Sequence, residues 1–150
     1  MDNNEVFAIA CDQAAYDLKL EVLKHLDERN IKYIDFGTDS TDSVDYPDFA
    51  HKACEAIQKG ECQRGILICG TGIGMSMCAN KHKGIRAACV SDTFSTKATR
   101  MHNDANVICF GARVIGKGLA FDIVDIFIDT EYEGGRHQRR IDKMMSLENQ

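Results

Sequence analysis

The sequence predicts an α/β protein in which a parallel sheet is covered by helices on both faces. Short apolar runs recur along the chain, and they are continuous rather than alternating, as expected of strands buried on both sides. Segments with helical periodicity separate these runs, and such alternation is typical of right-handed βαβ units. The length of 150 residues fits one domain, residues 1–150, with one hydrophobic core.

Five apolar runs are the expected strands. They cover residues 6–11, 33–36, 65–69, 85–90 and 107–110. The first expected helix carries Leu18, Val22 and Leu26 at helical spacing. The others lie at about 49–58, 73–81, 95–102 and 119–128. Pro47 is the only proline, and it favours a helix start nearby because proline is tolerated in a first helical turn.

Composition and charge exclude several classes of protein. The net charge of −5 argues against a nucleic-acid partner, which requires a basic surface. No stretch approaches the roughly 20 apolar residues that cross a bilayer, and residues 1–5 lack the basic start of a secretion signal. The seven cysteines form no C-x-x-C pair, which favours a reducing cytoplasm and gives a metal site little weight.

Three polar motifs follow expected strands, at the edge where open parallel sheets bind ligands. They are Asp12-Gln13, Asp45-Tyr46 and the glycine-rich run 69–74. In that run the glycines let backbone N–H groups approach an anion at a helix start. The run has neither the Walker A sequence nor the spacing of a dinucleotide fingerprint, and a turn that merely connects two elements is the alternative.

Cys69 stands at the end of the third expected strand, directly before the glycine-rich run. A helix N-terminus favours the thiolate form of a nearby cysteine, and proton abstraction requires such a base. Most other cysteines lie in apolar patterns that indicate core positions, namely Cys54, Cys78, Cys89 and Cys109. The sequence therefore singles out Cys69 as the candidate base.

Two motifs in the second half of the chain each have two interpretations. His102 lies at the end of the fourth expected helix, where it is either a general acid/base or a helix C-terminal charge. Arg136 and Arg140 are four residues apart, and they share one face if a helix follows Gly134-Gly135. They then suit a phosphate, whereas a solvated basic turn is the alternative.

Taken together, these motifs resemble the type B ribose-5-phosphate isomerases, a family that also holds allose-6-phosphate and galactose-6-phosphate isomerases. The matching segments, between about residues 6 and 144, are Asp12, 45–47, 65–74, 79–81, 84–87, 102–106 and 133–137. The resemblance implies a Rossmann-like three-layer α/β/α sandwich with a five-stranded parallel sheet, no metal or other cofactor, and a homodimer or tetramer. It also implies that the C-terminal segment, about 131–150, packs on a neighbouring subunit.

The resemblance further implies roles for individual residues. Cys69 would move a proton from C2 to C1 of an open-chain aldose, through an enediolate whose oxyanion is held by Thr71 and the glycine-rich turn. His102 would open the sugar ring, with Asp12 close to the ring. The implied substrate ligands are Gln13, Tyr46, Gly70, Gly72, Gly74, Asn103, Arg113, Arg136 and Arg140, with Arg113 supplied by a neighbouring subunit.

Two positions distinguish this chain within the family pattern. Where one branch has a glutamate base, this chain has Met75, which leaves Cys69 as the base. Where the family usually has Asp-His, this chain has Asp12-Gln13, and glutamine donates hydrogen bonds but carries no charge. Ribose 5-phosphate is the expected substrate. The alternatives are allose 6-phosphate or galactose 6-phosphate, a phosphosugar-binding module without catalysis and, from the glycine-rich turn alone, a nucleotide-binding domain.

Overall fold

The computed structural model describes residues 4–150 and contains one five-stranded sheet. The strand order is β2-β1-β3-β5-β4, and all neighbouring strands are parallel. The strands are β1 (Val6–Cys11), β2 (Lys32–Asp35), β3 (Arg64–Cys69), β4 (Ala87–Cys89) and β5 (Val107–Gly111). The predicted parallel α/β fold is therefore confirmed. Residues 1–3, part of the N-terminal segment that was expected to lack a secretion signal, lie outside the described residues.

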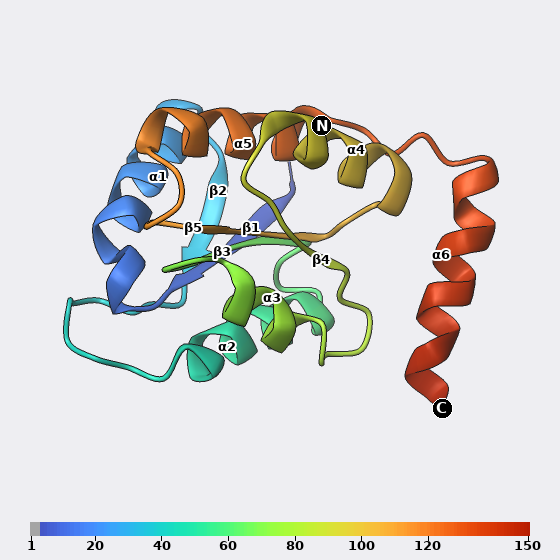
Figure 1. Cartoon of the computed structure of the whole chain (residues 1–150), viewed down its shortest axis with the longest axis horizontal. Coiled ribbons are helices and arrows are strands. Elements are labelled where there is room, and N and C mark those ends of the chain that lie inside the picture. Colours follow the sequence, from blue (N-terminus) through green and yellow to red (C-terminus); the bar gives the residue numbers. More distant parts are fainter. Residues whose placement is uncertain (1–3) are drawn as a thin grey trace.

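Helices cover both faces of this sheet, as Figure 1 shows. One face carries α1 (Tyr16–Glu28), α4 (Thr93–Asn103) and α5 (Lys117–Asp129), and the other carries α2 (Tyr46–Gln58) and α3 (Ile73–Ala79). Successive strand residues point to opposite faces, so β1 contributes Phe7 and Ile9 to one hydrophobic cluster and Ala8 and Ala10 to the other. This double burial explains why the strand sequences are continuously apolar.

The two outer strands depart from the sequence prediction. β2 is largely exposed because it lies at one edge of the sheet. At the other edge, β4 covers only three of the six residues predicted for this strand. Just before β4, the side chain of Asn106 takes part in the pairing, since its Oδ1 accepts the backbone N–H of Arg86 at 2.8 Å.

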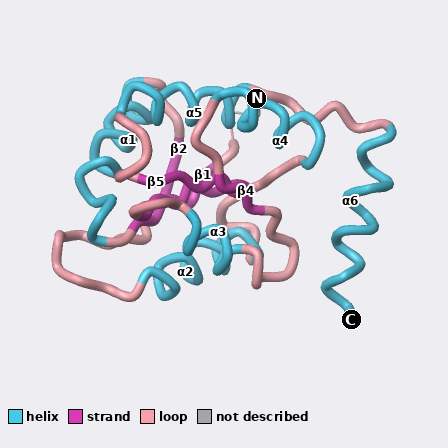
Figure 2. The backbone as a smooth tube through the Cα atoms, in the orientation of Figure 1, coloured by secondary structure: helices cyan, strands magenta, loops and turns pink. Residues whose placement is uncertain are grey.

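A sixth helix, α6 (Arg136–Ser146), follows Gly134 and Gly135, both of which have a positive φ. The helix stands apart from the sandwich, at the end opposite the long loop between β2 and α2 (Figures 1 and 2). His137 and Ile141 form its buried side, near α4. Among the described residues, no helix combines the length and apolar character needed to cross a membrane.

Candidate active site

The turn after β3 brings Cys69 to the carboxyl edge of the sheet. Cys69 is the last residue of β3 and pairs with Gly111 at the end of β5. Its thiol is buried, and its Sγ accepts a hydrogen bond of 3.1 Å from the backbone N–H of Gly72. This N–H lies at the start of α3, so the positive end of the helix dipole faces the sulfur atom.

Three glycines shape this turn, because atoms of other residues occupy the space that a Cβ would need at each position. Gly72 has a φ of +81°, and a Cβ there would lie 2.8 Å from the backbone of Phe110. A Cβ on Gly111 would lie 2.4 Å from Cα of Thr71, so the turn rests directly on β5. A Cβ on Gly74 would lie 2.7 Å from the ring of Tyr46. The glycines therefore allow Thr71 to rest on β5 and the Tyr46 ring to lie against the first turn of α3.

The other thiols have different surroundings. Burial raises the pKa of Cys11 and of Cys54 to about 12, and it raises the pKa of Cys109 well above the usual value. The predicted core positions of Cys54 and Cys109 are confirmed. The core prediction is wrong for Cys89, which is exposed because β4 is an edge strand. Cys78 is half-buried and packs against the core from outside.

Asp12 and Gln13 follow β1 at the same edge of the sheet. The Asp12 side chain is buried, and its Oδ1 has no hydrogen-bond partner within residues 4–150. A buried oxygen of this kind is rare in proteins and suits a ligand that supplies a hydroxyl donor. Gln13 is already engaged, because its Oε1 accepts the backbone N–H of Val44 at 3.1 Å. Gln13 thereby holds the loop between β2 and α2.

The sequence analysis missed Lys19, which anchors the same loop. Lys19 is fully buried, and its Nζ donates to both carboxylate oxygens of Asp35, at 2.9 and 3.0 Å, and to the carbonyl of Thr38. The backbone of Thr38 in turn pairs with Cys11, directly before Asp12. A signal was present, since Lys19 shares helical spacing with the buried residues Val22 and Leu26.

Arg113 lies at the Cys69 edge of its own chain. Its backbone N–H donates to the carbonyl of Gly70 at 3.0 Å, and a Cβ on Gly70 would lie 3.5 Å from the Arg113 side chain. A chain can therefore supply Arg113 to its own Cys69 edge, whereas the resemblance implied that a neighbouring subunit supplies it. Because Arg113 follows the carboxyl end of β5, the topology itself places it beside the carboxyl end of β3.

The remaining predicted site residues form a second group at the opposite edge of the sheet. His102 and Asn103 end α4, which runs back from the carboxyl edge over 11 residues, or about 15 Å. The carbonyl of Asn103 accepts the side chain of Arg86, which directly precedes β4. Arg136 and Arg140 lie on α6 at this same end (Figure 1). One chain thus does not bring His102 to Cys69.

The arginines divide into paired and unpaired sets. Four bind carboxylates within the chain, namely Arg29, Arg64, Arg86 and Arg100. Within the described part of the chain, no ion pair is formed by Arg113, Arg136, Arg139 or Arg140. Three of these, Arg113, Arg136 and Arg140, are substrate ligands that the resemblance implied. A helix does follow Gly135, which was the condition for a shared face, and it places Arg136 and Arg140 one turn apart.

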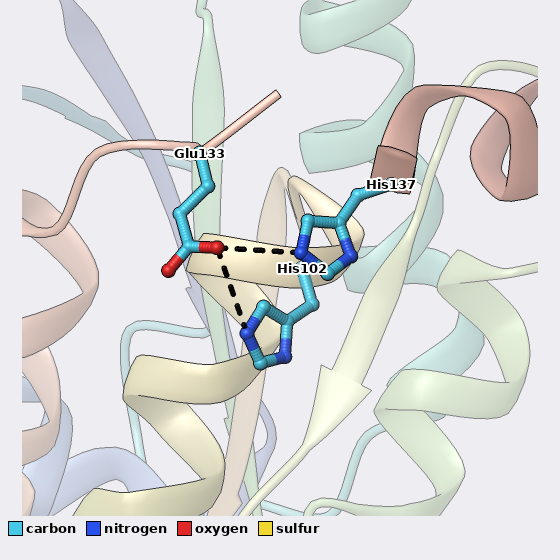
Figure 3. A group of neighbouring side chains, drawn as sticks. All are labelled: His102, Glu133 and His137. Atoms are coloured by element: carbon cyan, nitrogen blue, oxygen red, sulfur yellow. Dashed lines mark ion pairs between the residues drawn. The ribbon is translucent and has the colours of Figure 1, made fainter. Parts of the chain in front are cut away.

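His102 has two close neighbours that the sequence analysis did not assign (Figure 3). Its ring stacks on that of His137, with centroids 4.5 Å apart. Glu133 Oε2 lies 3.9 Å from Nε2 of His102 and 3.3 Å from Nε2 of His137. Both neighbours lie in the segment 133–137, which was a matching segment of the family resemblance, but a role was assigned there to Arg136 alone.

A separate groove of about 840 Å³ lies between the end of α6 and the β4 edge. Its walls include Ile85, Met144 and Met145, and Asn103 is the single predicted site residue on them. The groove is therefore distinct from the Cys69 edge.

The fold and the Cys69 edge define an α/β protein in which the carboxyl edge of the sheet suits a small anionic ligand. This edge holds a buried thiol, a carboxylate oxygen that accepts no hydrogen bond within residues 4–150, and Arg113, which forms no ion pair among the same residues. Comparison with known families specifies this class further. The model of the ribose/galactose isomerase family matches residues 7–144, and the chain belongs to that family.

Individual relatives cover nearly the whole chain. Ribose-5-phosphate isomerase B of Escherichia coli (strain K12) is 47% identical over 94% of this chain and 95% of its own. The solved structure of ribose-5-phosphate isomerase B from Clostridium thermocellum is 47% identical, with a TM-score of 0.94 over 96% of this chain and 97% of its own. That of a Thermotoga maritima ribose 5-phosphate isomerase is 46% identical, with a TM-score of 0.93 over 95% and 99%.

Proposed function

We propose that this chain is an aldose–ketose isomerase that converts ribose 5-phosphate to ribulose 5-phosphate. The observation that carries the proposal is the Cys69 thiol, whose Sγ accepts the Gly72 N–H. Asp12 lies at the same edge of the sheet, and its Oδ1 has no hydrogen-bond partner within the described residues. A base next to an acceptor for sugar hydroxyls is what proton transfer between C1 and C2 requires. The likeness to ribose-5-phosphate isomerases B supports the choice of substrate.

In the proposed reaction, the Cys69 thiolate removes the C2 proton of the open-chain aldose and returns it to C1. The electron pair left at C2 forms the enediolate, and its negative charge collects on the C1 oxygen. The C2 hydroxyl proton then passes to the C1 oxygen as C1 takes the carbon-bound proton, which leaves a carbonyl at C2. Thr71 Oγ1 accepts the N–H of Ile73 at 3.2 Å, which leaves the hydroxyl hydrogen of Thr71 for the C1 oxygen. One such donor is typically worth about 3 kcal/mol of transition-state stabilisation. Asp12 Oδ1 accepts a sugar hydroxyl.

A second copy of the chain completes the site in this proposal. It contributes His102 for ring opening, Asn103 for a sugar hydroxyl, and Arg136 and Arg140 for the phosphate, because their own chain holds them at the far edge of the sheet. A two-fold dimer forms two equal sites of this kind. Large apolar side chains surround the Cys69 edge and suit a protein partner, namely Ile73, Met77, Phe94 and Val114.

The proposal extends to organisation and compartment. Residues 1–150 act as one domain, and the segment 131–150 packs on the neighbouring subunit. The seven cysteines are all free thiols, which supports the reducing cytoplasm as the location.

A panel of ligands tests the proposed activity. The protein is incubated with ribose 5-phosphate, allose 6-phosphate and galactose 6-phosphate, and ketose formation is measured. We expect ribulose 5-phosphate as the fastest product. If only a six-carbon sugar phosphate yields a ketose, that sugar phosphate is the substrate in place of ribose 5-phosphate. If none of the three yields a ketose, the isomerase proposal is refuted. Tight binding without turnover, unrepaired by Gln13→His, indicates a binding module. Thermal stabilisation by NAD or ATP alone indicates a nucleotide site.

A further inference from the structure

Three potential metal ligands converge at the far edge of the sheet, where α4 ends and α6 begins. His102 comes from α4, His137 from α6, and Glu133 from the segment before α6. Figure 3 shows that the Nε2 atoms of both histidines are directed at the same carboxylate oxygen of Glu133. The three ligand atoms lie within 4.8 Å of one another.

The separation between Glu133 and His137 matches the coordination shell of a small cation. Ligand atoms at about 2.0 Å from zinc in a tetrahedron lie about 3.3 Å from one another. The carboxylate oxygen is 3.3 Å from His137 Nε2 and 3.9 Å from His102 Nε2. The His102 side chain is 42% exposed, so its ring is free to rotate out of the stack and close the longer distance.

The state of His137 is a second, independent observation. The residue is only 9% exposed, yet its Nε2 has no hydrogen-bond partner within the described residues. The 3.3 Å approach to Glu133 is an ion-pair contact without hydrogen-bond geometry. A buried nitrogen without a hydrogen-bond partner is costly, and here it faces the point on which the other two ligands converge.

We propose that His102, Glu133 and His137 bind a zinc-type divalent cation. Two imidazoles and one carboxylate form a ligand set that zinc accepts, and three protein ligands leave a fourth position for water. Under the function proposed above, on which this second part rests, the bound cation occupies the nitrogen that His102 needs for ring opening. Zinc then acts as a reversible inhibitor of the isomerase.

A second histidine pair in the chain provides a matched control. His51 and His82 are also close, but Nδ1 of His51 lies 2.8 Å from Nε2 of His82, as in a direct hydrogen bond between the rings. Glu55 contacts the other nitrogen of His51 and also pairs with Lys59. These groups are occupied by one another and do not converge on a common point.

Titration of the full-length protein with Co²⁺ tests the site without substrate. Co²⁺ is a spectroscopic substitute for zinc, and we expect one ion per chain with visible absorption of a four- or five-coordinate complex, displaced by Zn²⁺. Glu133→Gln and His137→Gln each weaken Co²⁺ binding at least about tenfold. Glu133 is exposed, so its variant keeps the fold, whereas His51→Gln binds Co²⁺ as the parent does.

Several outcomes would contradict the proposed metal site. They are the absence of bound Co²⁺, unchanged Co²⁺ binding in Glu133→Gln, loss of Co²⁺ binding in His51→Gln, and a thiolate charge-transfer band that reports cysteine ligands.

The inhibitory role is tested separately, by measuring the isomerase rate as Zn²⁺ is added and then removed with a chelator. We expect activity to fall with occupancy and to return with the chelator, equally in His51→Gln. Stoichiometric binding without inhibition contradicts the inhibitory role. Absence of isomerase activity in metal-free protein contradicts the proposed function instead.

Discussion

The chemistry attributed to Cys69 depends on its position at the start of α3. Burial raises the pKa of Cys11 and of Cys54 to about 12, which keeps both thiols neutral at physiological pH. Cys69 accepts a backbone N–H at the start of a helix. The sequence predicted this position from a strand followed by glycines, but it could not show that Gly111, some 40 residues later along the chain, supports the turn.

Replacing the thiol tests this assignment at the residue scale. Cys69→Ala is expected to lower kcat by about 10²–10⁴-fold while the affinity for substrate changes little, because the base acts in the transition state. Exchange of the C2 proton with deuterated solvent measures the chemical step, and calorimetry measures binding. Cys62→Ala, a buried thiol away from the turn, serves as the control. Exchange at the parent rate in Cys69→Ala means that the base lies elsewhere.

Gly74 provides a second test, because Tyr46 occupies the space of a side chain there. In Gly74→Ala the new Cβ would lie 2.7 Å from the Tyr46 ring, so the ring moves and KM rises. Overpacking also costs about 1–3 kcal/mol of unfolding free energy. Gly118→Ala is the matched control, since nothing lies within 4 Å of its Cβ. Unaltered KM and stability in Gly74→Ala would show that the contact with Tyr46 is unimportant.

Among the elements, all five strands were predicted, but the exposure of the two outer strands was not. β1, β3 and β5 are buried on both faces, so their apolar runs are long and continuous. β4 is an edge strand, where the side chain of Asn106 takes part in the pairing and where Cys89 meets solvent. Burial within a sheet depends on strand order, and a local pattern does not contain that order.

The loop between β2 and α2 depends on α1 through one buried charge. Lys19→Met removes the cation that pairs with Asp35 and the Thr38 carbonyl. We expect a loss of about 3 kcal/mol in unfolding free energy, at the lower end for buried pairs because Asp35 is 28% exposed. Denaturant unfolding measures it, with Lys24→Met on the exposed side of the same helix as the control. Equal unfolding free energies of the two variants would show that Lys19 does not anchor the loop.

At the scale of the whole molecule, the predicted site residues are divided between two edges of the sheet. A helix that follows a parallel strand returns to the amino edge, so His102 at the end of α4 lies far from Cys69. The same rule places Arg113, directly after β5, at the Cys69 edge of its own chain. Strand order and connection direction could have predicted this division. How two chains pack could not be predicted, because it depends on surfaces distant in sequence.

Mixing two inactive variants tests the central claim, that one active site takes Cys69 from one chain and His102 from another. Cys69→Ala and His102→Asn are each expected to be inactive alone. After subunit exchange, half of the dimers are mixed, and each mixed dimer has one intact site, so roughly a quarter of the parent activity returns. A mixture that stays inactive, although mass spectrometry shows the mixed dimers, would contradict the shared site.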